Sequence, residues 1–192
     1  HPLYGNISII SEDIGICCHI KNNLVWEQHI LDILTKIMKD RPGTFIDAGS
    51  FIGPHSIGIS KLVPNTKIVA FEPTKQAFKC LQENAKRCFS NIEVHNVALS
   101  NTNSKGFMME RENDGNPGGC FLKNQLDASD AIHKIKMMHP IEIRTLDSFN
   151  IENVSLIKID TEGEEDNVIL GAVNTIKKNR PVIVIEIQGG CT

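Results

Sequence analysis

The segment TFIDAGSFIG, residues 44–53, decides the fold of this chain. A short apolar run leads into Asp47, and two glycines, Gly49 and Gly53, follow it four residues apart. This order is typical of a strand that turns into a helix, where a residue without a Cβ lets the backbone come close to a ligand. The turn lacks the third glycine of the G-x-G-x-x-G pattern, so it does not favour a pyrophosphate ligand.

Around this segment, strand-like and helix-like apolar patterns alternate. Such alternation indicates βαβ units and therefore a mostly parallel sheet with helices on both faces, a Rossmann-like α/β fold. Residues 3–20 read as irregular or short β structure, with candidate strands at 7–10 and 16–20. We predict helices over residues 24–39, 55–62, 165–178 and from Thr74 to Cys88, and strands from Thr44 and over residues 67–71, 92–98, 155–159 and 182–187.

The alternation is interrupted between residues 99 and 146. Residues 106–110 and 141–145 are expected to form an antiparallel pair, with one helix near residues 129–137. Between them lies the glycine-rich loop NDGNPGG, residues 113–119. A long excursion of this kind in a compact domain is usually functional or disordered. We predict a lid over the cleft that uses Asn116, Gly118 and Gly119.

Length and composition limit the possible classes. A chain of 192 residues fits one domain, divided here into an N-terminal cap (1–43), a cofactor-binding half (44–98), the inserted lid (99–147) and the last two strands (148–192). Its net charge of −3 and pI near 6.2 do not favour nucleic acid or anionic membranes. No apolar run reaches the ~20 residues of a membrane span. Six cysteines without a zinc spacing predict reduced thiols and a cytoplasmic location, and the start without methionine suggests a domain of a longer protein.

Four predicted strands end in or near a carboxylate: Asp47, Glu72, Asp160 and Glu186. In an open α/β sheet the ligand binds beyond the carboxyl ends of the strands. Glu72 lies about 20–25 residues after the glycine turn, where a carboxylate can accept hydrogen bonds from the hydroxyls of a ribose. Asp47 leads the glycine turn, where a carboxylate suits an amine-bearing ligand better than an anionic one. A ligand with a ribose, an amino-acid ammonium group and no phosphate is S-adenosylmethionine.

Six segments carry a family resemblance: residues 45–53 (FIDAGSFIG), 69–73 (VAFEP), 96–100 (NVALS), 114–119 (DGNPGG), 144–147 (RTLD) and 157–163 (IKIDTEG). In this order and spacing the chain resembles the FkbM-type class I S-adenosylmethionine-dependent methyltransferases. The resemblance covers most of the chain and implies methylation of hydroxyl groups on small molecules. It differs at Gln188, where the family commonly has histidine, and in the absence of the family's last two strands. The resemblance assigns Asp47, Gly49 and Gly53 to the methionine moiety, Glu72 to the ribose, and Val97 and Ala98 to the adenine. Ser50, Phe51 and Asp160 are further candidate cofactor-binding residues.

An alcohol needs a base before it can attack a methyl group. Asp160 is our first candidate, because its strand directs it at the cleft, and Glu162 and Glu186 are the next. Asp160 is equally well explained as a residue that positions the cofactor. The carboxylates could also hold Mg²⁺ with a diol of the acceptor as chelate.

Two other functions remain open. An RNA ribose 2′-O-methyltransferase would require a basic surface and a lysine beside the catalytic aspartate; Lys158 supplies the second and the net charge opposes the first. A non-catalytic cofactor-binding domain would bind S-adenosylmethionine without turnover. The low aromatic content of 5% and the polar excursion favour a hydrophilic acceptor, and we expect a sugar or glycan.

Overall fold

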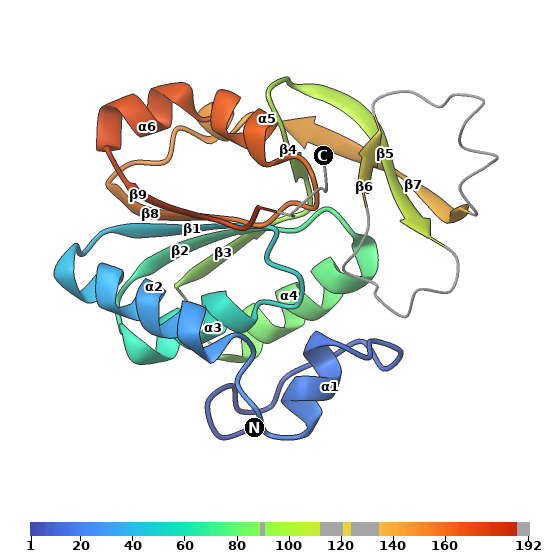
Figure 1. Ribbon diagram of the computed structural model, residues 1–192, viewed down its shortest axis with the longest axis vertical. Coiled ribbons are helices and arrows are strands. Elements are labelled where there is room, and N and C mark those ends of the chain that lie inside the picture. The colour runs from blue at the N-terminus through green and yellow to red at the C-terminus, as the bar shows by residue number, and fades with distance from the viewer. Residues whose placement is uncertain (89–90, 112–120, 124–134, 188–192) are drawn as a thin grey trace.

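A five-stranded parallel sheet forms the centre of the protein (Figure 1). The computed structural model describes residues 1–88, 91–111, 121–123 and 135–187. The strand order is β3-β2-β1-β8-β9, which confirms the predicted Rossmann-like α/β fold. These strands are β1 (Thr44–Ala48), β2 (Lys67–Phe71), β3 (Ile92–His95), β8 (Val154–Ile159) and β9 (Val182–Ile185).

Helices cover both faces of this sheet (Figure 1). Alternate residues of β1 point to opposite faces: Phe45 packs into one buried apolar cluster, and Ile46 and Ala48 pack into the other. Both faces of the sheet are therefore largely apolar, with the buried charged pair of Asp47 and Lys158 as an exception on the first face. The first face carries α2 (Gln28–Asp40), α3 (Pro54–Leu62) and α4 (Lys75–Cys88), and the second carries the 3-10 helix η2 (Leu146–Phe149), α5 (Glu165–Leu170) and α6 (Val173–Asn179).

The excursion forms a second sheet with the order β4-β7-β5-β6. The predicted antiparallel pair is confirmed, since β5 and β7 pair with Gly106 opposite Ile141. The helix expected over residues 129–137 is wrong at its end, because residues 135–137 belong to β7; residues 129–134 lie outside the described part. The strands are β4 (Ala98–Leu99), β5 (Ser104–Arg111), β6 (Phe121–Lys123) and β7 (Ile135–Arg144).

The predicted single strand over residues 92–98 is divided between the two sheets. Asn96 causes the division, since its side-chain amide donates to the carbonyl oxygens of Glu72 (2.8 Å) and Pro73 (3.0 Å). The chain therefore leaves β3 and continues as β4, whose Ala98 pairs with Ile143 of β7. This step brings the second sheet beside the carboxyl end of the first.

The N-terminal strands were predicted wrongly. Residues 16–20 belong to the helix α1 (Ile16–Lys21), in which Cys17 and Ile20, three residues apart, are buried. The carboxylate of Asp13, three residues before the helix, accepts the backbone N–H of Cys17 in the first turn. Residues 7–10 form no strand, although Asn84 imitates a strand partner by bonding both the N–H (2.6 Å) and the carbonyl (2.9 Å) of Ser8.

Two helix boundaries also differ from the prediction. The first long helix begins at Gln28 instead of residue 24, because Asn23 and Glu27 have left-handed backbones (φ 62° and 42°). The helix predicted over residues 165–178 is broken into α5 and α6 at Gly171, whose carbonyl accepts from the N–H of Asp147 (2.9 Å). The Asp147 carboxylate in turn accepts the backbone N–H of Asn174 (2.9 Å) and of Thr175 (2.8 Å), at the first turn of α6.

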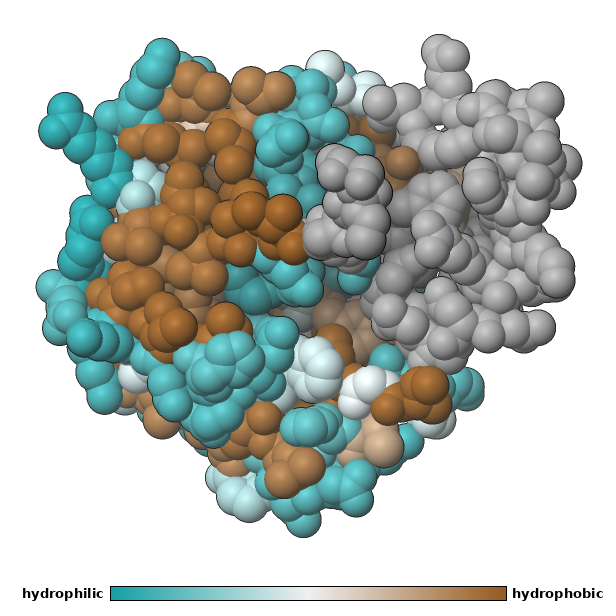
Figure 2. Space-filling model, viewed as in Figure 1, coloured by the Kyte–Doolittle hydropathy of each residue, from teal (hydrophilic) through white to brown (hydrophobic). Residues whose placement is uncertain are grey.

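The β9 edge of the central sheet is only partly covered. Val182, Ile183, Val184 and Ile185 are half-buried, unlike the fully buried residues of β1. Apolar side chains gather over this side of the molecule in Figure 2. Among the described helices, none combines the length and the apolar character that crossing a bilayer requires.

Candidate active site

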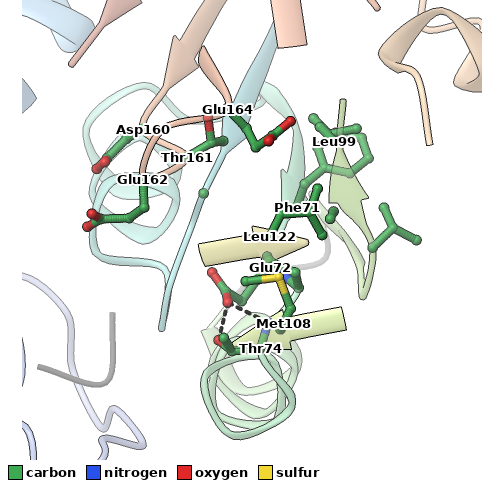
Figure 3. A pocket seen from close by; sticks show the side chains of 14 residues that line it. Phe71, Glu72, Thr74, Leu99, Met108, Leu122, Asp160, Thr161, Glu162 and Glu164 are labelled. Atoms are coloured by element: carbon green, nitrogen blue, oxygen red, sulfur yellow. Dashed lines mark hydrogen bonds between the residues drawn. The ribbon is translucent and has the colours of Figure 1, made fainter. Parts of the chain in front are cut away.

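A pocket lies between the carboxyl end of the central sheet and the second sheet. Figure 3 shows Glu72 and Thr74 on one side of it and Asp160, Thr161, Glu162 and Glu164 on the opposite side. The predicted strand-end carboxylates come from four adjacent strands, since β2, β1, β8 and β9 are neighbours. The residues that line the pocket are Gly49, Phe71, Glu72, Pro73, Thr74, Val97, Ala98, Leu99, Met108, Leu122, Asp160, Thr161, Glu162 and Glu164.

The glycine turn is shaped by contacts within the protein. The N–H groups of Gly49 and Ser50 both donate to the carbonyl of Phe71, at 3.0 and 2.9 Å. Gly49 has φ +83°, and a Cβ there would lie 1.7 Å from the carbonyl oxygen of Asp160. Gly53 has φ +92°, and a Cβ there would lie 2.8 Å from the side chain of Leu81. The sequence argument explained both glycines by a bound ligand, whereas chain packing and positive φ already require them.

Of the five predicted cofactor-binding residues in and before the turn, Gly49 lines the pocket. The others make hydrogen bonds within the protein or precede a helix. The Ser50 hydroxyl donates to the carbonyl of Asp47 (2.7 Å), and the Phe51 N–H donates to Glu72 (2.9 Å). Gly53 precedes α3 directly. Direct cofactor contacts at Asp47, Ser50, Phe51 and Gly53, which are not among the residues that line this pocket, stay a prediction.

Glu72 connects the turn to the pocket. Its Oε2 accepts the Phe51 N–H, and its Oε1 accepts both the N–H (2.8 Å) and the hydroxyl of Thr74. The backbone carbonyl of Thr74 starts α4 by accepting from Phe78 (2.8 Å). Burial raises the pKa of the Glu72 carboxyl to about 7, against the opposing effect of these hydrogen bonds. Among the described residues, Oε2 accepts from Phe51 alone and so keeps the capacity to accept another hydrogen bond.

Asp160 forms the opposite end of the pocket with a buried lysine. The Lys158 ammonium donates to Asp160 Oδ2 at 2.8 Å, and the Lys158 side chain is 6% exposed. Burial alone would lower the Lys158 pKa, but the carboxylates of Asp160 and Asp47 outweigh it and raise that pKa. The pKa of Glu186 is raised to about 7, mainly by the charge of Asp160, then by burial and by a hydrogen bond with Asp160. Two of the three predicted catalytic carboxylates are therefore in direct contact.

The remaining wall of the pocket is apolar. Val97 and Ala98, which we had assigned to an adenine, are buried and line it. Met108 and Leu122 of the second sheet lie in the same wall (Figure 3). Our sequence reading missed these two, together with Thr161 and Glu164. The strand predicted over residues 106–110 contains Met108, but nothing in the sequence brought that strand to the sheet edge.

Three further predictions concern the lid, Glu162 and a magnesium ion. Asn116, Gly118 and Gly119, the predicted lid, lie outside the described residues, as does Gln188. Glu162 lines the pocket with a left-handed backbone (φ 54°). For the magnesium hypothesis, the described ranges contain no group of three or more His, Cys, Asp or Glu side chains arranged to hold a metal ion.

The sequence profile of the FkbM methyltransferase domain matches residues 49–190, which is most of the chain. The protein belongs to this family. The match includes Gly49, Glu72 and Asp160, which line the pocket described above.

Similar proteins support a methyltransferase. The chain is 28% identical over 148 residues to Methyltransferase 1 of Beauveria bassiana, covering 66% of this chain and 57% of that protein. It is 26% identical over 150 residues to the hexuronic acid methyltransferase AglP of Haloferax volcanii, covering 75% of this chain and 55% of that protein. This FkbM-family chain thus spans little more than half the length of these two relatives.

A solved structure supports the fold. Methyltransferase FkbM from Methylobacillus flagellatus KT superimposes with a TM-score of 0.53 at 19% sequence identity, covering 74% of this chain and 32% of that one. At this identity the likeness concerns the arrangement of strands and helices. It agrees with the parallel sheet and the flanking helices of the present structure.

Proposed function

We propose that this protein transfers a methyl group from S-adenosylmethionine to a hydroxyl group of a small hydrophilic acceptor, with a sugar or glycan as the preferred class. One observation carries the proposal. A single pocket joins an apolar wall, the buried carboxylate of Glu72 and, opposite, the carboxylate of Asp160. An adenine, a ribose and a reacting hydroxyl require these three environments in one place.

The residues present fit S-adenosylmethionine. Val97, Ala98 and Met108 offer apolar contact to an adenine, and Glu72 Oε2 can accept a ribose hydroxyl. When bound, the cofactor supplies an electrophilic methyl group on a sulfonium, and carboxylates nearby stabilise that positive charge. Gly49 offers a lining without a side chain between these two ends.

The chain's own contribution is to orient the acceptor and to remove its proton. The contact with Lys158 fixes Asp160 Oδ2, so the carboxylate has a set orientation at the pocket. Glu186, with a pKa of about 7, can exchange a proton near neutral pH, where general bases are most effective. We assign proton removal to the pair of Asp160 and Glu186, and we keep Glu162, which lines the same pocket, as the third candidate.

The test is methyl transfer from S-adenosyl-[methyl-³H]methionine to a panel of sugars, glycans and nucleosides. With the acceptor that the panel identifies, Asp160→Asn should lower turnover by about 10²-fold or more. Its affinity for S-adenosylhomocysteine should remain within about threefold of wild type. Full turnover in Asp160→Asn would exclude the catalytic role, and loss of affinity would mark Asp160 as a cofactor-positioning residue. Glu12→Gln, at an exposed carboxylate of the N-terminal segment, is the matched control.

One observation favours a second candidate, methylation of an RNA ribose. The 2.8 Å contact between Lys158 and Asp160 places a lysine beside the proposed catalytic aspartate. The charge of the pocket opposes an RNA acceptor, because the carboxylates of Glu72, Glu162 and Glu164 line it and would repel a polyanion. Transfer to a short RNA in the same panel, with none to sugars, would replace our proposal.

A further inference from the structure

A second polar cluster lies beside the pocket, under the helices α2 and α3. Asp47 of β1 stands opposite Lys158 of β8 in the sheet register. Both side chains are buried, and they lie on the face of Phe45 and Leu156, whose apolar cluster includes residues of α2 and α3. The Asp47 Oδ2 accepts the hydroxyl of Ser56 at 2.6 Å, but its buried Oδ1 has no hydrogen-bond partner in the described part of the chain.

His55 lies in the same cluster, at the first turn of α3. It is 4% exposed, and its Nε2 has no hydrogen-bond partner among the described residues. Burial, and then the positive charges of Lys158 and His29, lower its pKa to about 3, so the imidazole is neutral. Oε2 of Glu27 lies 3.5 Å from Nε2. A neutral imidazole at this distance does not neutralise that carboxylate.

Glu27 approaches from the segment before α2, which our sequence reading assigned no role at the site. Its backbone is left-handed (φ 42°), which is uncommon for a residue other than glycine, and its side chain makes no capping bond to the helix. The neighbouring Trp26 N–H donates to the hydroxyl of Tyr4 (3.2 Å), and Tyr4 is fully buried, so the segment is held in place. Residues held in such conformations concentrate at functional sites.

The charges around Glu27 do not balance. Glu27 interacts electrostatically with both Lys158 and Glu186, and Glu186 with Asp160. One ammonium group, that of Lys158, is already bonded to Asp160 and also interacts with Asp47 and Glu27. Glu186 adds part of a negative charge near neutral pH, since its pKa is about 7. The Glu27 side chain is 26% exposed, so it can meet a ligand, and it can only accept hydrogen bonds when ionised.

We infer that Glu27 is a specificity-determining residue that accepts a hydrogen bond from the methyl acceptor, and that this acceptor carries hydroxyl or amino groups and no negative charge near the reacting position. The inference rests on the proposed function and narrows its substrate class. A carboxylate on the acceptor would be a further negative charge beside Glu27 and Asp160, and the Lys158 ammonium is already bonded to Asp160. The site is thus expected to select against a uronic acid, although one similar protein is named as a hexuronic acid methyltransferase.

The test uses the full chain saturated with S-adenosylhomocysteine. Saturation-transfer difference NMR measures the binding of three probes: methyl α-glucoside, glucosamine and glucuronic acid. Wild type should bind the first two at least about tenfold more tightly than glucuronic acid. Glu27→Gln should weaken them by about tenfold, as expected for a hydrogen bond to a charged group. The control Glu12→Gln should leave all three unchanged.

Several results separate the possibilities. Equal binding of glucuronic acid, an unchanged Glu27→Gln, or no binding of any probe to protein that does bind S-adenosylhomocysteine would each overturn the inference. Failure of wild type to bind S-adenosylhomocysteine would instead overturn the proposed function. Glu27→Asp keeps the charge on a shorter side chain and should recover part of the binding. If Glu27→Gln does not fold, the binding of the probes to Glu27→Asp decides. Unchanged binding to Glu27→Asp would then mean that residue 27 does not contact the acceptor.

Discussion

Replacing Lys158 by methionine should destabilise the protein strongly and in a pH-dependent way. The substitution keeps the volume of the side chain and removes an ammonium group that is nearly fully buried between Asp160 and Asp47. Removing one partner of a buried ion pair costs about 3–5 kcal/mol, because the other charge is left unpaired. We expect about 3 kcal/mol at pH 8, since Asp160 is 27% exposed and recovers some hydration.

The pH dependence follows from Asp47. Burial already raises its pKa above the ordinary value of 3.8, and Lys158 opposes this rise. Without Lys158 the folded pKa rises further, so the folded state binds more protons than the unfolded state as pH increases above about 4. Stability then falls with rising pH until the folded pKa is passed, and the loss is larger at pH 8 than at pH 5. Lys158 itself, with a pKa raised above 10.5, does not titrate in this range.

Urea unfolding followed by circular dichroism at pH 5 and pH 8 measures both effects. Lys67→Met is the matched control, because Lys67 starts β2 of the same sheet and both partners of its 3.6 Å ion pair with Glu93 are exposed. That pair should contribute less than about 1 kcal/mol. Equal losses in the two variants, or a Lys158→Met loss that is the same at both pH values, would refute the reasoning about the buried cluster.

Further predictions concern the turn and the proposed base. Gly49→Ala should cost more than about 3 kcal/mol by urea unfolding, since the added Cβ meets the Asp160 carbonyl in a left-handed backbone. Gly163→Ala (φ +106°), where a Cβ meets nothing within 4 Å, should cost only about 1–2 kcal/mol, and similar losses would contradict the packing argument. Turnover at saturating cofactor should rise between pH 6 and pH 8 as Glu186, with its pKa of about 7, loses its proton. A pH–rate profile of Glu186→Gln should lack this rise, and an unchanged profile would remove Glu186 from the proton path.

The sequence was sufficient for the central sheet. The strand beginning at Thr44, the strand over residues 67–71 and the pattern of carboxylates at strand ends depend on local periodicity and on the parallel α/β rule. The division of residues 92–98 was not predictable in this way. It depends on the Asn96 amide reaching two carbonyl groups more than twenty residues away, a contact that no local pattern contains.

The sequence predicted Glu72 and Asp160 on the two sides of the candidate pocket, but not its apolar residues from the second sheet. Glu72 and Asp160 follow strands directly, so topology alone brings them to one edge. Met108 and Leu122 come from strands whose placement depends on pairing within the second sheet. The role proposed for Glu27 depends in the same way on a left-handed backbone before α2 that no local pattern predicts. The same holds for α1. Residues 16–20 were predicted as a strand, but they form a helix in which the N–H of Cys17 donates to the carboxylate of Asp13.

Isothermal titration of the purified protein with S-adenosylhomocysteine tests the central claim most directly. The account predicts binding at one site per chain, weakened by about tenfold or more in Glu72→Ala, which removes the proposed acceptor for the ribose hydroxyls. The same titration of Glu12→Ala, at an exposed carboxylate, should match wild type. Absence of binding to the wild-type protein, or binding that Glu72→Ala leaves unchanged in a folded protein, would contradict it.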